Sequence, residues 1–234
     1  MFKKHTTFNV LYFLILILNI YALVSEHQIL RIIATPLIGM SLMLYLIIKT
    51  RLENNFHKLI MAALVLSMAG DIQLLFATGA EFYFLTALVA TLLGYILYSI
   101  AYYIDFKKDF SAPKRIGNRL LVILIVSLIS LYVTASRNLG SFKYPTLAYV
   151  TVLSAMVVLS GYRFKRVNQL SFKLILTGSF SFFISDLAIG YYNFIDQESI
   201  MMIIYLSTYI IAQYLVVIGT IERRPLKSRV YPEL

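Results

Sequence analysis

Eight stretches of mostly apolar residues follow one another with short polar joins, and they limit the possible folds of this chain more than any other feature. A helix that crosses the hydrocarbon core of a bilayer needs about 20 such residues. Its backbone must satisfy its hydrogen bonds internally, because lipid offers no partners. The stretches therefore predict membrane-spanning helices at residues 8–24, 28–48, 57–76, 82–103, 117–135, 143–161, 171–194 and 199–221.

The composition agrees with a membrane protein. The chain is 60% hydrophobic and 14% charged, with a mean hydropathy of +0.80, whereas a soluble domain carries about 25% charged residues. We expect an all-α polytopic bundle in a single transmembrane domain that spans residues 1–234. Little sequence remains outside the bilayer, which excludes a soluble catalytic domain.

Basic residues gather on one side of the predicted bundle. With eight spans both termini share a side, and that side holds all of the 21 lysines and arginines except Arg31, Arg137 and Lys143. This is the positive-inside pattern, and it predicts cytoplasmic termini in an integral membrane protein. We take the membrane to be the inner membrane of a bacterium. The net charge of +10 then reflects topology signals and contacts with anionic lipids, and we expect the bilayer as partner and no nucleic acid.

The first stretch resembles the charged start and apolar core of a signal peptide. It follows Lys3, Lys4 and His5, but no convincing small-residue cleavage site comes after it. Its removal would also leave seven spans and spoil the match between charge and topology. We therefore interpret it as a retained helix.

Motifs for cofactors and metals do not occur in the sequence. The chain has no cysteine and only three histidines, which lie at loops or predicted helix ends. HExxH, Walker, GxSxG and GxGxxG patterns are absent as well. We expect neither a metal ion nor a cofactor.

The two halves of the chain resemble each other. Pro36 in the second span has a counterpart in Pro145 of the sixth, and Asp71 in the third has a counterpart in Asp186 of the seventh. Four helices per half give both halves the same orientation. This pattern predicts a parallel internal repeat, with a boundary in the polar linker 105–119 and halves of roughly residues 1–110 and 111–234.

Asp71 and Asp186 are the strongest functional signal. A carboxylate inside a bilayer costs roughly 2.5–3.5 kcal/mol on insertion scales, so a chain that carries two at matching places is expected to use them. Counting from the predicted helix starts, they lie about 21 and about 22 Å along their helices, at a common depth.

Other polar residues share faces with these carboxylates. Tyr95 and Tyr98 lie on one side of the fourth span, and Tyr209 and Gln213 lie on one side of the eighth. We expect the third, fourth, seventh and eighth helices to converge on a polar chamber, since polar groups in a bilayer turn inward. The other tyrosines and phenylalanines are interpreted as an aromatic belt at the helix ends.

Two carboxylates in one desolvated cavity can serve as an acid and base pair. They titrate apart, so that one holds a proton while the other is ionised. A second interpretation gives each aspartate only a structural role, as acceptor of an interhelical hydrogen bond from a tyrosine or serine.

Five short motifs, in order, resemble those of the YhhN-like lysoplasmalogenase family of eight-helix membrane proteins. They are TPL at 35–37, GD at 70–71, LLGYILYS at 92–99, ISDLAIG at 184–190 and YIIAQYLV at 209–216. The resemblance runs from about Thr35 to Glu222. Thr35 stands where the family often has lysine, and Tyr95 stands where it often has histidine.

The resemblance implies a reaction and roles for these residues. It implies hydrolysis of the vinyl-ether bond of a lyso-ether phospholipid, which gives a fatty aldehyde and a glycerophospho-base. Asp71 and Asp186 would be the acid/base pair. The substrate or water would be oriented by the residues Tyr95, Tyr98, Tyr209 and Gln213.

Two other functions are consistent with the same residues. A small-solute or proton-coupled transporter also has repeats and polar groups near the midplane, but it needs an aqueous path to both sides. A structural or assembly protein would use the polar groups only as satisfied contacts between helices.

Overall fold

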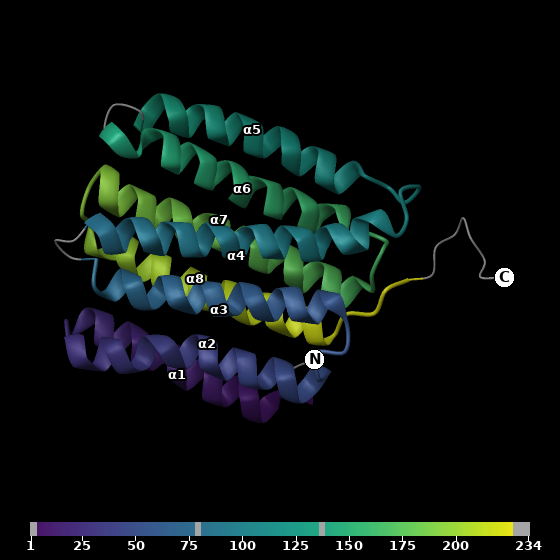
Figure 1. Ribbon diagram of the computed structural model, residues 1–234, viewed down its shortest axis with the longest axis horizontal. Coiled ribbons are helices and arrows are strands. Elements are labelled where there is room, and N and C mark those ends of the chain that lie inside the picture. The colour runs from purple at the N-terminus through teal and green to yellow at the C-terminus, as the bar shows by residue number, and fades with distance from the viewer. Residues whose placement is uncertain (1–3, 78–80, 136–138, 227–234) are drawn as a thin grey trace.

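The predicted helices are all present in the structure. The computed structural model describes residues 4–77, 81–135 and 139–226, and in these ranges it forms eight α-helices and one short 3-10 helix (Figure 1). The elements are α1 (Thr6–Val24), α2 (Gln28–Thr50), α3 (Asn55–Leu75), α4 (Glu81–Lys107), α5 (Arg115–Ala135), η2 (Gly140–Phe142), α6 (Lys143–Tyr162), α7 (Gln169–Phe194) and α8 (Ser199–Ile221). The all-α prediction is confirmed.

Seven of these helices are long and apolar enough to cross a membrane, which confirms a multi-pass membrane protein. The helix α5 is not among the seven, although eight spans are predicted from the sequence. It lies beside α6 at one edge of the bundle and runs along it (Figure 1). Arg137, predicted on the outer side, lies outside the described residues.

The helices form a flattened bundle, and the two helix pairs with the most extensive packing lie in its middle. The helices α1 and α2 lie at one edge, α5 and α6 lie at the other, and α3, α4, α7 and α8 lie between them (Figure 1). Packing is most extensive between α3 and α4 and between α7 and α8. Each half also pairs its second helix with the last helix of the other half, α2 with α8 and α6 with α4. The parallel repeat stays a prediction. A repeat of this kind predicts equivalent helix pairs in the two halves, and these pairs agree with it.

Small residues allow the central pairs to approach closely. A Cβ on Gly94 of α4 would lie 3.3 Å from the carbonyl oxygen of Ala63 in α3, and a Cβ on Gly178 of α7 would lie 3.0 Å from the carbonyl oxygen of Ala212 in α8. Close backbone approach replaces the hydrophobic effect as the source of helix association in lipid, since lipid tails are as apolar as the side chains.

Buried charges join the helices at the end of the bundle that carries both termini. Asp105 and Arg163 are fully buried, and Arg163 Nε donates to Asp105 Oδ2 at 3.0 Å. Arg223 Nε donates to the same oxygen at 3.0 Å. In the sequence these groups appear as part of the polar linker and as topology signals. Because they are buried, these ion pairs link α4 to the end of α6 and to the end of α8.

We predict that Asp105→Asn destabilises the protein strongly. The amide cannot neutralise Arg163 and Arg223, and removal of one partner from a buried ion pair costs about 3–5 kcal/mol. Thermal unfolding in detergent should show a large fall in Tm, whereas the exposed Glu53→Gln should leave Tm within error. Equal Tm values for the two variants would contradict a structural role for this ion pair.

Lys4 and His5, just before α1, contact the end of α8. Lys4 Nζ donates to Glu222 Oε1 at 2.5 Å, and His5 Nε2 lies 3.0 Å from the same oxygen. Burial acts to raise the pKa of Glu222, but hydrogen bonds and charge from Lys4 and His5 outweigh it, so this pKa lies below its ordinary value.

The Glu222 contribution to stability should therefore be lost in acid. A carboxyl whose pKa is lower in the folded state stabilises that state fully above its unfolded pKa, about 4.3, and less as pH falls through the folded value. At neutral pH Glu222→Gln should have a lower Tm than the wild type, and the gap should close below about pH 4.3. A gap that persists unchanged in acid would show that the loss comes from packing rather than from charge; Glu53→Gln serves again as control.

Candidate active site

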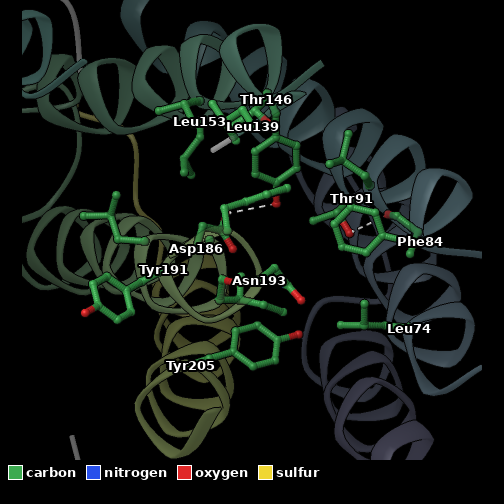
Figure 2. A pocket seen from close by; sticks show the side chains of 18 of the residues that line it. Leu74, Phe84, Thr91, Leu139, Thr146, Leu153, Asp186, Tyr191, Asn193 and Tyr205 are labelled. Carbon is green, nitrogen blue, oxygen red and sulfur yellow. Dashed lines mark hydrogen bonds between the residues drawn. The ribbon is translucent and has the colours of Figure 1, made fainter. Parts of the chain in front are cut away.

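A cavity of about 320 Å³ lies inside the bundle, at the end opposite to the termini. It is bounded by the last turns of α3 and α7, the first turns of α4, α6 and α8, and Leu128 of α5. Figure 2 looks into it: Asp186 lies near the middle, with Thr146 above, Leu74 and Phe84 to the right and Tyr205 below. Most of the lining side chains are apolar.

Asp71 and Asp186 both line this cavity. Asp71 comes from α3 and is 8% exposed, and Asp186 comes from α7 and is half-buried. The two carboxylates are close enough to interact electrostatically. The structure thus brings together the two residues that the sequence singles out, and it places them against apolar walls in which charge is poorly solvated.

Two phenols hold the carboxylate of Asp186. Tyr95 Oη donates to Asp186 Oδ2 at 2.7 Å, and Tyr149 Oη donates to the same atom at 3.0 Å. Tyr95 is fully buried in α4, and Tyr149 comes from α6. Tyr95 therefore bonds to the aspartate of the other half of the chain and not to Asp71 of its own half.

Asp71 also has a tyrosine of the other half of the chain as its neighbour. Tyr209 of α8 lines the cavity and interacts with Asp71, but not in hydrogen-bond geometry, and its buried hydroxyl has no partner among the described residues. Each aspartate therefore faces a tyrosine from the other half of the chain. Asp186 is held by two hydrogen bonds of standard geometry, whereas Asp71 has the looser interaction with Tyr209 on the cavity wall.

Of the four predicted binding residues, Tyr209 lines the cavity, and Tyr95 reaches it only through its hydrogen bond to Asp186. Tyr98 and Gln213 are buried and do not line it, and the polar ends of both side chains lack hydrogen-bond partners among the described residues. Tyr98 belongs to a layer of buried rings, with its centroid 5.9 Å from that of Phe182 and 6.3 Å from that of Tyr102. Helical spacing alone could show which face these residues share but not at which depth the cavity ends.

Three phenylalanines from three different elements meet beside the cavity, where α4 and α6 begin and α7 ends. Phe84 of α4 lies with its ring centroid 5.6 Å from that of Phe142 in η2, and Phe142 lies 6.0 Å from Phe194 of α7. Phe84 and Phe194 also line the cavity. The aromatic cluster gives the cavity an apolar rim at that end of the bundle.

Sequence reasoning missed the contribution of α6. Tyr149 was assigned with the aromatic belt, and that interpretation is wrong for this residue, because it donates a hydrogen bond to Asp186. Lys143 and Thr146 line the cavity from the same helix. The available signal was their spacing of three residues along the sixth apolar stretch, which places neighbours on adjoining faces of a helix.

In comparisons with known proteins, residues 30–220 match the YhhN family. The chain belongs to this family. No curated protein and no solved structure matches it. The YhhN match covers the helices that line the cavity, α3 to α8, apart from the last residue of α8. Within the described residues, no group of three or more His, Cys, Asp or Glu side chains is placed to hold a metal ion.

Gly70, which precedes Asp71, should be intolerant of a side chain. A Cβ there would lie 2.7 Å from Thr91 Oγ1 and 3.1 Å from the Ala87 carbonyl oxygen, so α3 and α4 must separate. We expect Gly70→Ala to cost about 1–3 kcal/mol, as overpacking does.

Gly190 provides the matched control for that substitution. It also lines the cavity, but a Cβ there meets nothing within 4 Å. Gly190→Ala should keep or raise the Tm, because alanine is the better helix former by roughly 1 kcal/mol. A Gly70→Ala variant as stable as Gly190→Ala would argue against tight packing beside Asp71.

Proposed function

We propose that this YhhN protein hydrolyses the vinyl-ether bond of a lyso-ether phospholipid, of the lysoplasmalogen type, to a fatty aldehyde and a glycerophospho-base. The observation that carries the proposal is that two carboxylates from different helices face one apolar cavity inside a membrane bundle. Membership of the YhhN family supports it. A lipid with a single chain can reach such a cavity from the bilayer.

The reaction needs one proton donor and one proton acceptor. A carboxylic acid protonates the vinyl carbon remote from the ether oxygen, which leaves an oxocarbenium ion. The second carboxylate takes a proton from water, whose oxygen bonds to the cationic carbon and gives a hemiacetal. The hemiacetal C–O bond then breaks: the glycerol oxygen takes from the second carboxyl group the proton that came from water, and the hemiacetal hydroxyl gives its proton to the first carboxylate as the aldehyde forms. One water molecule is consumed, and both carboxyl groups end as they began.

The hydrogen bonds support one distribution of these roles. Asp186 accepts two phenol hydrogen bonds, and donors of this kind stabilise a carboxylate. Asp186 is therefore the carboxylate that stabilises the oxocarbenium ion and activates water. Asp71 lacks a hydrogen bond of standard geometry among the described residues, and it is the carboxylic acid that protonates carbon. Tyr95 and Tyr149 position Asp186, and Tyr209 faces the acid.

The closed inner end of the cavity favours a hydrolase over a transporter. A transporter needs a path for its solute to the opposite end of the bundle. Beneath the cavity lie Tyr95, Tyr98 and Phe182, all fully buried, with ring centroids of neighbouring pairs 5.5 and 5.9 Å apart. This aromatic layer separates the carboxylates from the end that carries the termini.

Asp71→Asn and Asp186→Asn should each abolish most of the activity while the protein remains folded. The amide has nearly the shape of the carboxyl group but can neither deliver nor take up the proton, and positioned acid/base groups contribute roughly 10²–10⁴-fold to rates. The measurement is aldehyde release from lysoplasmalogen by purified protein in detergent.

Asp196→Asn is the matched control for both substitutions. Asp196 is exposed just beyond α7, at the same end of the bundle, and it does not line the cavity. This variant should retain wild-type turnover. Aldehyde release that survives Asp71→Asn and Asp186→Asn would refute the site, and its absence from the wild type would refute the reaction.

A further inference from the structure

We propose that Lys143 and Thr146 form the subsite for the polar part of the lipid, with Lys143 on the phosphate and Thr146 on the glycerol. The proposal rests on the proposed function and extends it to substrate selection: the protein requires a phosphate on the lyso-ether lipid. Neither residue takes part in the chemistry. Together they fix how far the chain enters, and thus which bond meets Asp186.

The sixth helix carries three polar side chains into the cavity at equal intervals. Lys143, Thr146 and Tyr149 all line it, and Tyr149 donates its hydrogen bond to Asp186. At 1.5 Å per residue, Thr146 lies about 4.5 Å and Lys143 about 9 Å along α6 from Tyr149. The helix thus presents a cation, a hydroxyl and the carboxylate-bound phenol in a fixed order from the rim inward.

The charges that line the cavity determine how an anionic ligand is oriented in it. Among the described residues that line the cavity, Lys143 is the only basic one, and Asp71 and Asp186 are the only acidic ones. A phosphate is repelled from the carboxylates and attracted to an ammonium group, which is a common phosphate ligand. The phosphate end of a substrate therefore lies toward Lys143, and the chain end lies among the apolar walls.

Thr146 supplies a polar atom that the protein itself does not use. Its Oγ1 is buried and has no hydrogen-bond partner among the described residues. Buried hydroxyls are nearly always hydrogen-bonded in folded proteins, so an unpaired one on a cavity wall calls for a partner. The free hydroxyl of a lyso-lipid glycerol lies between its phosphate and its ether oxygen, as Thr146 lies between Lys143 and Tyr149.

The spacing of the protein groups agrees with the length of the lipid. From the ether oxygen to the phosphorus of a glycerophospholipid there are five bonds, an extended span of about 6 Å at ordinary bond lengths. The flexible side chain of Lys143 covers the remainder of the roughly 9 Å along α6. With the phosphate held by Lys143, the vinyl ether reaches the level of Tyr149 and Asp186.

Two substrates, one with and one without the phosphate headgroup, provide the test. Hydrolysis of 1-alkenyl-lysophospholipid is compared with that of the corresponding 1-alkenylglycerol, for the wild type and for Lys143→Met, Lys143→Arg and Thr146→Val. The wild type should prefer the phospholipid about tenfold or more in kcat/KM, as a charge-assisted hydrogen bond predicts. Lys143→Met should lose that preference through KM, Lys143→Arg should keep it, and Thr146→Val should raise KM for both substrates.

A binding measurement separates this inference from the proposed reaction. The saturated 1-alkyl-lysophospholipid cannot be cleaved by this chemistry, and its Kd can be measured even for a variant with no turnover. Lys143→Met should weaken its binding about tenfold or more, whereas the exposed Lys173→Met, on α7 outside the cavity, should not.

Each outcome decides one of the two proposals. Equal Kd values for the wild type and Lys143→Met overturn the subsite, whatever the hydrolysis assay shows. Weakened binding without any aldehyde release supports the subsite and overturns the reaction. If Lys143→Met fails to fold, unchanged phosphate preference and Kd in Lys143→Gln overturn the subsite, and loss of both supports it.

Discussion

The organising constraint of this structure is the cost of placing two carboxylates inside a membrane bundle. The protein meets it by turning Asp71 and Asp186 toward one internal cavity and by aiming phenols at them, with Tyr95 and Tyr149 donating to Asp186. The packing follows from that need. Close contact between α3 and α4 and between α7 and α8, at small residues such as Gly94 and Gly178, holds together the helices that carry the two carboxylates.

The two ends of the bundle handle charge in opposite ways. At the end with the termini, Asp105 is matched by Arg163 and Arg223, so charge is neutralised and serves stability. At the other end the carboxylates lack a basic partner within hydrogen-bond reach in the described residues and face a cavity instead. Buried ion pairs are a common means of joining helices, whereas carboxylates that face open space can exchange protons. This contrast supports a chemical role for the second set.

Much of the fold could be predicted from the sequence because lipid permits few alternatives. Apolar stretches of spanning length must become helices, and carboxylates within them must face inward, which identified Asp71 and Asp186. Contacts between helices could not be predicted in the same way. The bond from Tyr95 to Asp186 depends on how the two halves pack, and Tyr149 looked like any other interfacial tyrosine. Helical spacing gives a face, whereas the partner across the cavity requires the tertiary arrangement.

The crossed pairing of tyrosines and aspartates has a consequence for biosynthesis. The first four helices bring Asp71 and Tyr95, and the last four bring Asp186 and Tyr209, so each group holds one carboxyl and the phenol for the other. A chain whose synthesis has stopped midway has neither pair. Both pairings are complete only after α8, which carries Tyr209, has entered the membrane, so an unfinished chain holds its carboxylates without the full set of phenols that faces them.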